Sequence, residues 1–222
     1  VADMFDFGNA NDGQRQAIAT ADGPVLITAG PGTGKTYTLV QRTIYLIEEC
    51  DVRPESIFIA TFTEKAAKEL VTRITNELAS RNITANINEM YIGTFHALCL
   101  RILKERLEYT RLRRNYRLMD SFDQQYMVFQ NIHRFRCIPE IEIVLPNGGA
   151  WKQAETICNF VNNLSEELVS PEELMSDHDP SIASLGRMLQ EYRAILTEEN
   201  LMDFSSIQIE AYRLLCDHED IL

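Results

Sequence analysis

Three short apolar runs along this chain of 222 residues are each followed by a segment of helical periodicity. The runs are "PVLITA" at 24–29, "SIFIATF" at 56–62 and "MYIGTF" at 90–95. Strands that are covered on both faces of a sheet are apolar throughout, and the helical segments show apolar residues every three or four positions. Three strand–helix units in succession predict an α/β fold with a parallel sheet flanked by helices.

The helices expected after these runs cover residues 35–49, 63–80 and 96–109. Thr63 is suited to the N-cap of the second helix, because its hydroxyl can accept a backbone N–H of the first turn. Glu64 stands four positions before Lys68, a spacing that supports an exposed helix face.

After Tyr109 the strand pattern thins out and long helical stretches follow at 121–136, 151–167 and 181–198. "SPEEL" predicts a further helix, with Ser170 as N-cap, Pro171 at the first position and Glu173 completing a capping box. The segment 139–150, "PEIEIVLPNGGA", is rich in Pro and Gly and predicts a loop.

The change of pattern predicts two domains. Residues 1–109 and 200–222 are expected to form an α/β domain that is incomplete at its C-terminus, and residues 110–199 an inserted, mostly helical subdomain. Hydrophobic residues make up 45% of the chain, which is enough for a sizeable core.

Composition indicates a cytoplasmic protein with no membrane partner. No apolar run approaches the roughly 20 residues that span a bilayer, and the first residues lack the pattern of a signal peptide. Neither disulfide nor zinc spacing is present among the cysteines, which are expected to be reduced. They are Cys50, Cys99, Cys137, Cys158 and Cys216.

Charge is distributed unevenly within a formal net charge of −12. Residues 1–100 carry a net charge of −4, residues 101–136 of +5, and residues 137–222 of −13. The overall acidity argues against a nucleic-acid partner, since phosphate binding is driven by Lys and Arg. The basic island at 101–117 allows such contact, although a solvated helix face explains it equally well.

The sequence "ITAGPGTGKT" at 27–36 predicts a phosphate-binding P-loop. Gly32 and Gly34 let the backbone turn so that successive N–H groups converge on phosphate oxygens at a helix N-terminus. Lys35 is expected to reach the β- and γ-phosphates, and the Thr36 hydroxyl to bind Mg²⁺. We therefore predict a nucleotide and Mg²⁺ as the ligands of this loop, with Lys35 and Thr36 as the catalytic residues. Ala29 replaces the first consensus glycine.

A P-loop enzyme also needs an acidic pair at a strand end, the Walker B position, to complete Mg²⁺ coordination. We find no such pair in the sequence, because the Glu pairs at 48–49, 166–167 and 198–199 all follow helical segments. The chain is therefore expected either to be a fragment or to bind nucleotide without turnover.

Five motifs resemble those of superfamily 1 DNA helicases of the UvrD/Rep type, in order and in approximate spacing. They are "NDGQRQAI", "AGPGTGKT", "TFTEKAAKEL", "GTFHAL" and "LMDFSSI". The resemblance implies the first RecA-like domain with its helical insertion, and thus the N-terminal, ATP-binding part of a 3′–5′ helicase that translocates on single-stranded DNA. Single/double-strand junctions and a missing C-terminal RecA-like domain would be its partners, and this part alone is expected to be inactive in hydrolysis.

The resemblance also implies a nucleotide site. Gln14 would read the adenine edge with its carboxamide, and Arg42 would lie beside the base. A solvated glutamine and a surface arginine are the alternatives. The predicted nucleotide-binding residues are Gln14, Ala29, Gly30, Pro31, Gly32, Thr33, Gly34, Lys35, Thr36, Tyr37 and Arg42.

The resemblance further implies a site for single-stranded DNA in the motifs "TFTEKAAKEL" and "GTFHAL". Glu64 stands where an asparagine is usual in the family, and Phe95 is expected in the core. Asp203 and Phe204 match the family's "DF" motif, and ordinary helix-start residues are their alternative. The predicted DNA-binding residues are Phe62, Thr63, Lys65, Ala66, Thr94 and His96.

Other functions stay open at this point. A helicase subunit of a helicase-nuclease fits the same motifs. A P-loop kinase or an ATP-binding module unrelated to unwinding fits the P-loop, but leaves "TFTEKAAKEL" and "GTFHAL" unexplained.

Overall fold

The second and third apolar runs form neighbouring parallel strands. In the computed structural model, which describes residues 5–218, these are β1 (Phe58–Thr61) and β2 (Tyr91–Thr94). Their register runs from Phe58 opposite Tyr91 to Thr61 opposite Thr94. Helices and parallel strands therefore both occur, and the predicted α/β class is confirmed at that level.

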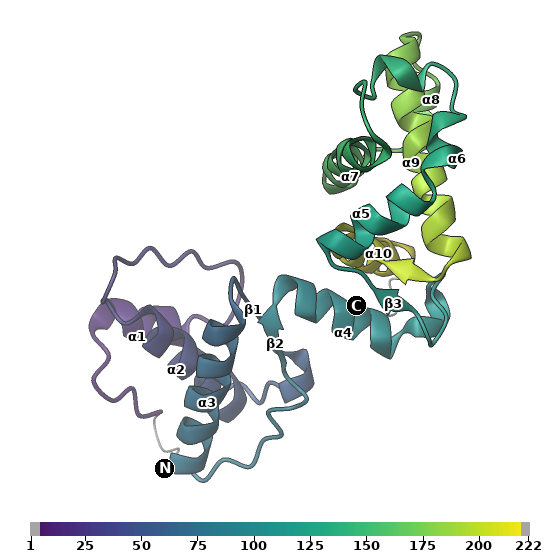
Figure 1. Ribbon diagram of the computed structural model, residues 1–222. Helices are drawn as coiled ribbons and strands as arrows, with labels where there is room; N and C mark the ends of the chain where they lie inside the picture. Colours follow the sequence, from purple (N-terminus) through teal and green to yellow (C-terminus); the bar gives the residue numbers. More distant parts are fainter. Residues whose placement is uncertain (1–4, 219–222) are drawn as a thin grey trace. The chain divides into compact units, whose positions relative to one another are not determined.

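Two units make up the described residues, and they divide between Leu98 and Cys99 (Figure 1). The first unit contains α1 (Asp12–Ala19), α2 (Lys35–Glu48), the 3₁₀ turn η1 (Pro54–Ser56) and α3 (Glu64–Ser80). Its core contains the fully buried side chains Ile18, Ile44 and Ile74, one from each α-helix. The two predicted helices in this unit are thus confirmed nearly to their ends, and Thr63 is the N-cap of α3.

The predicted strand at Pro24–Ala29 does not form. Within the first unit, β1 and β2 pair with each other, whereas residues 24–29 carry no strand assignment. The side chain of Leu26 is 92% exposed, and Val25 and Ile27 are also open to solvent. A strand needs a neighbour to accept and donate its backbone hydrogen bonds, and apolar composition alone cannot supply one.

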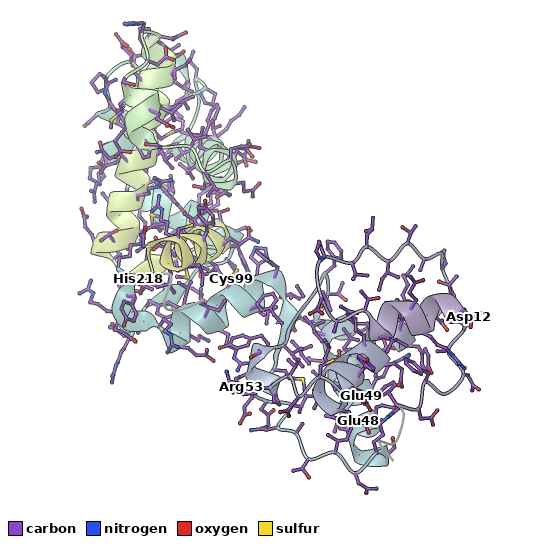
Figure 2. All side chains as sticks on the ribbon, turned by 180° about the vertical axis from the view of Figure 1, so that it is seen from behind. Asp12, Glu48, Glu49, Arg53, Cys99 and His218 are labelled. Atoms are coloured by element: carbon purple, nitrogen blue, oxygen red, sulfur yellow. The ribbon has the colours of Figure 1, made fainter. Side chains whose placement is uncertain are left out.

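Arg81, just after α3, ties three segments of the first unit together. Its guanidinium forms ion pairs with Glu48 and Glu77, each at 3.0 Å, and donates to the carbonyl oxygen of Asp6 at 2.6 Å. It also lies over the Phe5 ring, 4.3 Å from the centroid. Glu48 is on the last turn of α2 (Figure 2), so this one side chain links the N-terminal segment, α2 and α3.

The second unit is mostly helical. Its elements follow α4 (Phe95–Glu105), which contains the boundary between the units. They are η2 (Leu107–Tyr109), β3 (Arg117–Leu118), α5 (Ser121–Gln130), α6 (Ile132–Arg136), η3 (Ile141–Ile143), α7 (Ala150–Glu166), α8 (Pro171–Met175), α9 (Pro180–Glu198), β4 (Leu201–Met202) and α10 (Phe204–Asp217). The larger of its two cores joins α5, α6, α7 and α9, with Phe135, Ile157 and Leu189 fully buried.

The single helix predicted over 121–136 is wrong, because α5 and α6 are separate helices. Asn131 lies between them, and both its backbone N–H and its side-chain amide donate to the carbonyl oxygen of Met127, at 3.1 and 3.0 Å. Asparagine side chains compete with the helical backbone in this way and so end helices.

Ser170 is the N-cap of α8 and Pro171 opens the helix, as predicted. The Ser170 hydroxyl donates to Glu172 at 2.6 Å, so the carboxylate paired with the cap is that of Glu172 and not the expected Glu173.

Residues 201–217 pack within the second unit. β4 pairs in parallel with β3, and α10 packs on α7. The contacts of the chain therefore divide it after Leu98, and they group the last helix with residues 99–199. The assignment of residues 1–109 and 200–222 to one domain stays a prediction.

Candidate nucleotide and DNA sites

The P-loop has the backbone geometry that its glycines allow. Gly32 and Gly34 have φ values of 76° and 86°, in the left-handed region that disfavours side chains. Gly34 is the N-cap of α2, and a Cβ placed there would lie 2.8 Å from Nε2 of Gln14. The loop thus turns directly into the helix N-terminus, where free backbone N–H groups and the helix dipole favour an anion.

Lys35 is the first residue of α2, and its side chain folds back over the loop. Its Nζ donates to the carbonyl oxygens of Ala29 and Gly30, at 3.0 and 3.2 Å. Thr33 braces the same turn by donating its hydroxyl to the Gly30 oxygen at 2.8 Å. The ammonium group is exposed on the loop and lies where a phosphate would meet it.

Gln14 lies beside the P-loop because a capping box positions it. Asn11 caps α1, whose first residue Asp12 is labelled in Figure 2, and Asn11 and Gln14 exchange hydrogen bonds of 2.9 Å with each other's backbone N–H. The amide Nε2 of Gln14 then donates to the Thr33 carbonyl oxygen at 3.0 Å. One amide hydrogen and one oxygen lone pair remain for a further partner. The Asn-x-x-Gln spacing is the signal that could have predicted this arrangement.

Arg42 and Tyr37 hold the surroundings of the loop in place. One guanidinium nitrogen of Arg42 donates to the carbonyl oxygens of Ala17 and Thr20, which lie at the end of α1. The Tyr37 hydroxyl donates to the Phe7 oxygen at 2.9 Å. Thr36, the proposed Mg²⁺ ligand, is half-buried on the first turn of α2.

A pocket of about 690 Å³ opens between α1 and the P-loop. Gln14, Ala17 and Thr20 line one side, and Gly30, Thr33 and Lys35 line another. Residues 24–29 also line it, and the lining is completed by Asn11, Gly13, Gln16 and Thr38. Its volume lies within the roughly 300–1,000 Å³ of pockets that hold small molecules. Of the predicted nucleotide residues, the structure therefore brings Gln14, Ala29, Gly30, Thr33 and Lys35 to one pocket.

The predicted DNA residues lie at one edge of the two-stranded sheet. Because β1 and β2 are parallel and in register, their carboxyl ends meet at Thr61 and Thr94. Phe62 follows β1, and its side chain is fully exposed. The Thr61 hydroxyl donates to the carbonyl oxygen of Thr63 at 3.0 Å, and it lies 3.4 Å from that of Gly93 on β2.

Threonine caps organise both turns at this edge. The Thr63 hydroxyl accepts from the N–H of Ala66, and the Thr94 hydroxyl accepts from the N–H of Ala97, each at 3.2 Å. Lys65 and His96 follow as exposed side chains in the first turns of α3 and α4. Phe95 was expected in the core, and this expectation is wrong. The residue is 53% exposed and begins α4 directly after β2.

A second pocket, of about 380 Å³, lies between α3 and β2. Its lining includes Glu64, Lys68 and Thr94. Residues of both charges therefore line this pocket.

Asp203 of the "DF" motif belongs to a buried polar network in the second unit, whereas Phe204 is 57% exposed. Asp203 caps α10, accepting from the N–H of Ser206 at 2.7 Å, and only 4% of the residue is exposed. Its other carboxylate oxygen accepts from the Tyr192 hydroxyl, which in turn accepts from Nε2 of Gln124 at 2.8 Å. Burial, and then the charge of Asp203, raise the pKa of Tyr192. The network joins α5, α9 and the N-terminus of α10, and no motif in the sequence predicts it.

Residues 5–218 contain neither a cluster of metal-binding side chains nor a helix suited to a membrane. No group of three or more His, Cys, Asp or Glu side chains is arranged to hold a metal ion there. Nor does any helix in the same range have the length and apolarity to cross a membrane.

Several proteins named as DNA helicases are similar to this chain over most of its length. The chain is 32% identical over 206 residues to the ATP-dependent DNA helicase SRS2 of Saccharomyces cerevisiae, covering 85% of this chain and 17% of SRS2. It is 31% identical over 205 residues to PcrA of Staphylococcus epidermidis, covering 90% and 25%. It is 32% identical over 213 residues to Rep of Buchnera aphidicola, covering 94% and 29%.

The chain thus spans less than a third of each of these relatives. Residues 10–222 match the model of the UvrD/REP helicase N-terminal domain, a range that includes the P-loop, both strand edges and the "DF" motif. The chain therefore belongs to the UvrD/REP helicase family.

Proposed function

We propose that this chain binds ATP with Mg²⁺ and forms one wall of an ATP-dependent DNA helicase that moves 3′ to 5′ along single-stranded DNA. The observation that carries the proposal lies in the first unit. One compact body holds both a P-loop at the N-terminus of α2 and a strand edge that presents a fully exposed Phe62. An aromatic ring open to solvent has no packing role and is suited to stacking on a base.

ATP would enter the pocket beside α1. Its phosphates would accept from the backbone N–H groups of the loop, and Lys35 would exchange the carbonyl oxygens of Ala29 and Gly30 for phosphate oxygens. The remaining amide N–H of Gln14 can donate to N7 of adenine, and its remaining oxygen lone pair can accept from the N6 amino group. The Thr36 hydroxyl is an oxygen donor of the kind that Mg²⁺ prefers. A bound Mg²⁺ would neutralise phosphate charge.

The remaining parts of the proposal lie partly outside this chain. A RecA-like parallel sheet flanked by helices would be built around β1 and β2. An acidic Walker B strand and a second RecA-like domain would close over the nucleotide, and the substrate would be a junction between single- and double-stranded DNA. Without those parts, we expect nucleotide binding by this chain with negligible hydrolysis.

Nucleotide binding is tested by titrating the chain with Mg-ATP and Mg-ADP in a calorimeter. Lys35→Ala should abolish binding, because it removes the only side-chain cation in the lining of the pocket. Lys65→Ala is the matched control, since Lys65 is also exposed but lies at the strand edge. Equal affinities of the parent and the Lys35→Ala chain would exclude the P-loop as the nucleotide site.

DNA binding is tested by fluorescence anisotropy with a labelled oligo(dT). Phe62→Ala should weaken binding by about 1–3 kcal/mol, the contribution of stacking on one base. Phe58→Ala is the control, because Phe58 is a half-exposed phenylalanine at the opposite end of β1. Lys65→Ala should reduce the log-log salt slope by about 0.7. If the two phenylalanine variants bind alike, the strand edge is not the DNA site.

Helicase activity is tested with the complete gene product on duplexes that carry either a 3′ or a 5′ single-stranded tail. Unwinding from the 3′ tail, with ATPase stimulated by single-stranded DNA, is expected. ATPase that is indifferent to DNA would favour an unrelated P-loop module, and unwinding from the 5′ tail alone would contradict the proposed polarity.

A further inference from the structure

Three arginines gather around one small cavity in the second unit, remote in sequence from the P-loop. The cavity has a volume of about 140 Å³ and lies among α7, α9, α10 and the segment after η2 that carries Arg111. Arg111, Arg193 and Arg213 line it, together with the hydroxyl-bearing residues Ser165, Thr197 and Ser206. The basic side chains come from three separate segments, so the fold and not a local run of charge brings them together.

Arg111 has an unused donor at this place. Its Nε pairs with Glu210 at 2.9 Å, and its Nη2 lies 3.3 Å from the carbonyl oxygen of Leu201. Its Nη1 is buried and has no hydrogen-bond partner among the described residues. A buried N–H group that has lost its water costs free energy unless an acceptor meets it.

The charges around the cavity are not balanced. Glu210 is the only carboxylate in the lining, and Glu172 acts on Arg193 and Arg213 from the exposed start of α8. Burial, and then the charge of Arg213, lower the pKa of Arg193, as expected where like charges meet with too few acceptors. An anion in the cavity would relieve this repulsion.

We propose that this cavity binds a phosphate group, held by Arg111, Arg193 and Arg213. Guanidinium groups match phosphate oxygens with paired, charge-assisted hydrogen bonds, and the hydroxyls of Ser165 and Ser206 can donate to the remaining oxygens. The volume suits a single tetrahedral oxyanion. It holds several waters, each of which needs roughly 10–15 Å³, but it lies far below the roughly 300 Å³ at which small-molecule pockets begin. The phosphate group comes either from free inorganic phosphate or from a nucleic-acid backbone.

The test uses the whole chain with Lys35→Ala, so that phosphate binding at the P-loop does not contribute. Inorganic phosphate and a ten-nucleotide oligo(dT) without terminal phosphate are titrated separately. Arg213→Gln should weaken binding of one of them about tenfold, since it removes a charged hydrogen-bond donor from an exposed position without opening the core. Arg193→Gln should weaken binding of the same ligand.

Arg187→Gln is the matched control, because Arg187 also lies on α9 but is not part of the lining. Loss of inorganic phosphate binding identifies the free ion as the ligand, whereas loss confined to the oligonucleotide identifies a backbone phosphate. The proposal is overturned if neither ligand binds, or if Arg213→Gln and Arg193→Gln bind both ligands as tightly as Arg187→Gln does. Mg-ATP binding at the P-loop is measured separately, in the chain that keeps Lys35. Failure of the phosphate cavity can therefore be distinguished from failure of the proposed nucleotide site.

Discussion

Removing one hydroxyl from the buried network should destabilise the second unit. In Tyr192→Phe the ring stays in place, but Asp203 loses the hydrogen bond from the hydroxyl, and the Gln124 amide loses an acceptor at 2.8 Å. Asp203 keeps the N–H of Ser206 at 2.7 Å, and Gln124 keeps Asn162 at 2.7 Å, so neither group is left without a partner. Loss of a hydrogen bond to a charged group costs about 1.5–3 kcal/mol. We expect about 2 kcal/mol, or roughly a 30-fold change in the folding equilibrium.

The single tryptophan makes this change measurable in the right unit. Trp151 lies on α7, within the unit that contains the network, so its fluorescence follows unfolding of that unit in urea. With a urea dependence of about 2 kcal/mol per molar, the midpoint should fall by about 1 M.

Tyr212→Phe is the control, because it removes the same atom from an exposed tyrosine on α10 and should change stability by less than about 0.5 kcal/mol. If Tyr192→Phe costs no more than this control, the network contributes nothing to stability and our account of Asp203 is wrong.

Three further predictions concern other sites. Arg81→Met should destabilise the first unit by about 2–3 kcal/mol, because it breaks two ion pairs of a side chain that is only 15% exposed. Arg73→Met is the control, since Arg73 lies on the exposed face of α3 and its loss should be near neutral. Circular-dichroism melts measure both. Burial raises the pKa of Cys158 from 9.0 to about 12, so between these pH values the thiol ionises in the unfolded chain but stays protonated in the folded one. The free energy of unfolding should therefore be intact below pH 9 and fall by about 1.4 kcal/mol per pH unit between pH 9 and pH 12. Urea titrations at several pH values should show a flatter decline for Cys158→Ala. Gln14→Ala should cost ATP about 1–3 kcal/mol of binding and leave GTP unaffected in competition titrations; equal losses for both would remove Gln14 from base recognition.

Local signals predicted much of this structure because they depend on neighbours in sequence. The Thr63 cap, the start of α2 at Lys35 and the Pro171 helix start each involve atoms within four residues. The strand predicted at 24–29 was wrong, because a strand also needs a neighbouring strand, and the apolar run itself does not specify one.

The sites also differ in whether they are built from a short stretch of sequence or from residues far apart in it. The P-loop motif predicted the turn at Gly32 and Gly34 and the helix start at Lys35, because both depend only on a short stretch of sequence. The phosphate cavity and the buried network could not be predicted. Arg111 and Glu210 stand 99 positions apart, and Gln124 and Asp203 stand 79 apart, so only the packing of helices brings them together.

The open run at 24–29 also governs how copies of the chain behave toward one another in concentrated solution. Between Asp22 and Lys35 the sequence carries no charge, and Val25, Leu26 and Ile27 present an apolar surface that neighbouring molecules can share. At low ionic strength the net charge of −12 keeps molecules apart. At a salt concentration near 0.15 M the repulsion is screened beyond about 8 Å, so two molecules can approach closely enough for these apolar side chains to make contact. Colloidal stability should therefore decline as salt is added, and light scattering should rise with salt less steeply in a Leu26→Lys chain.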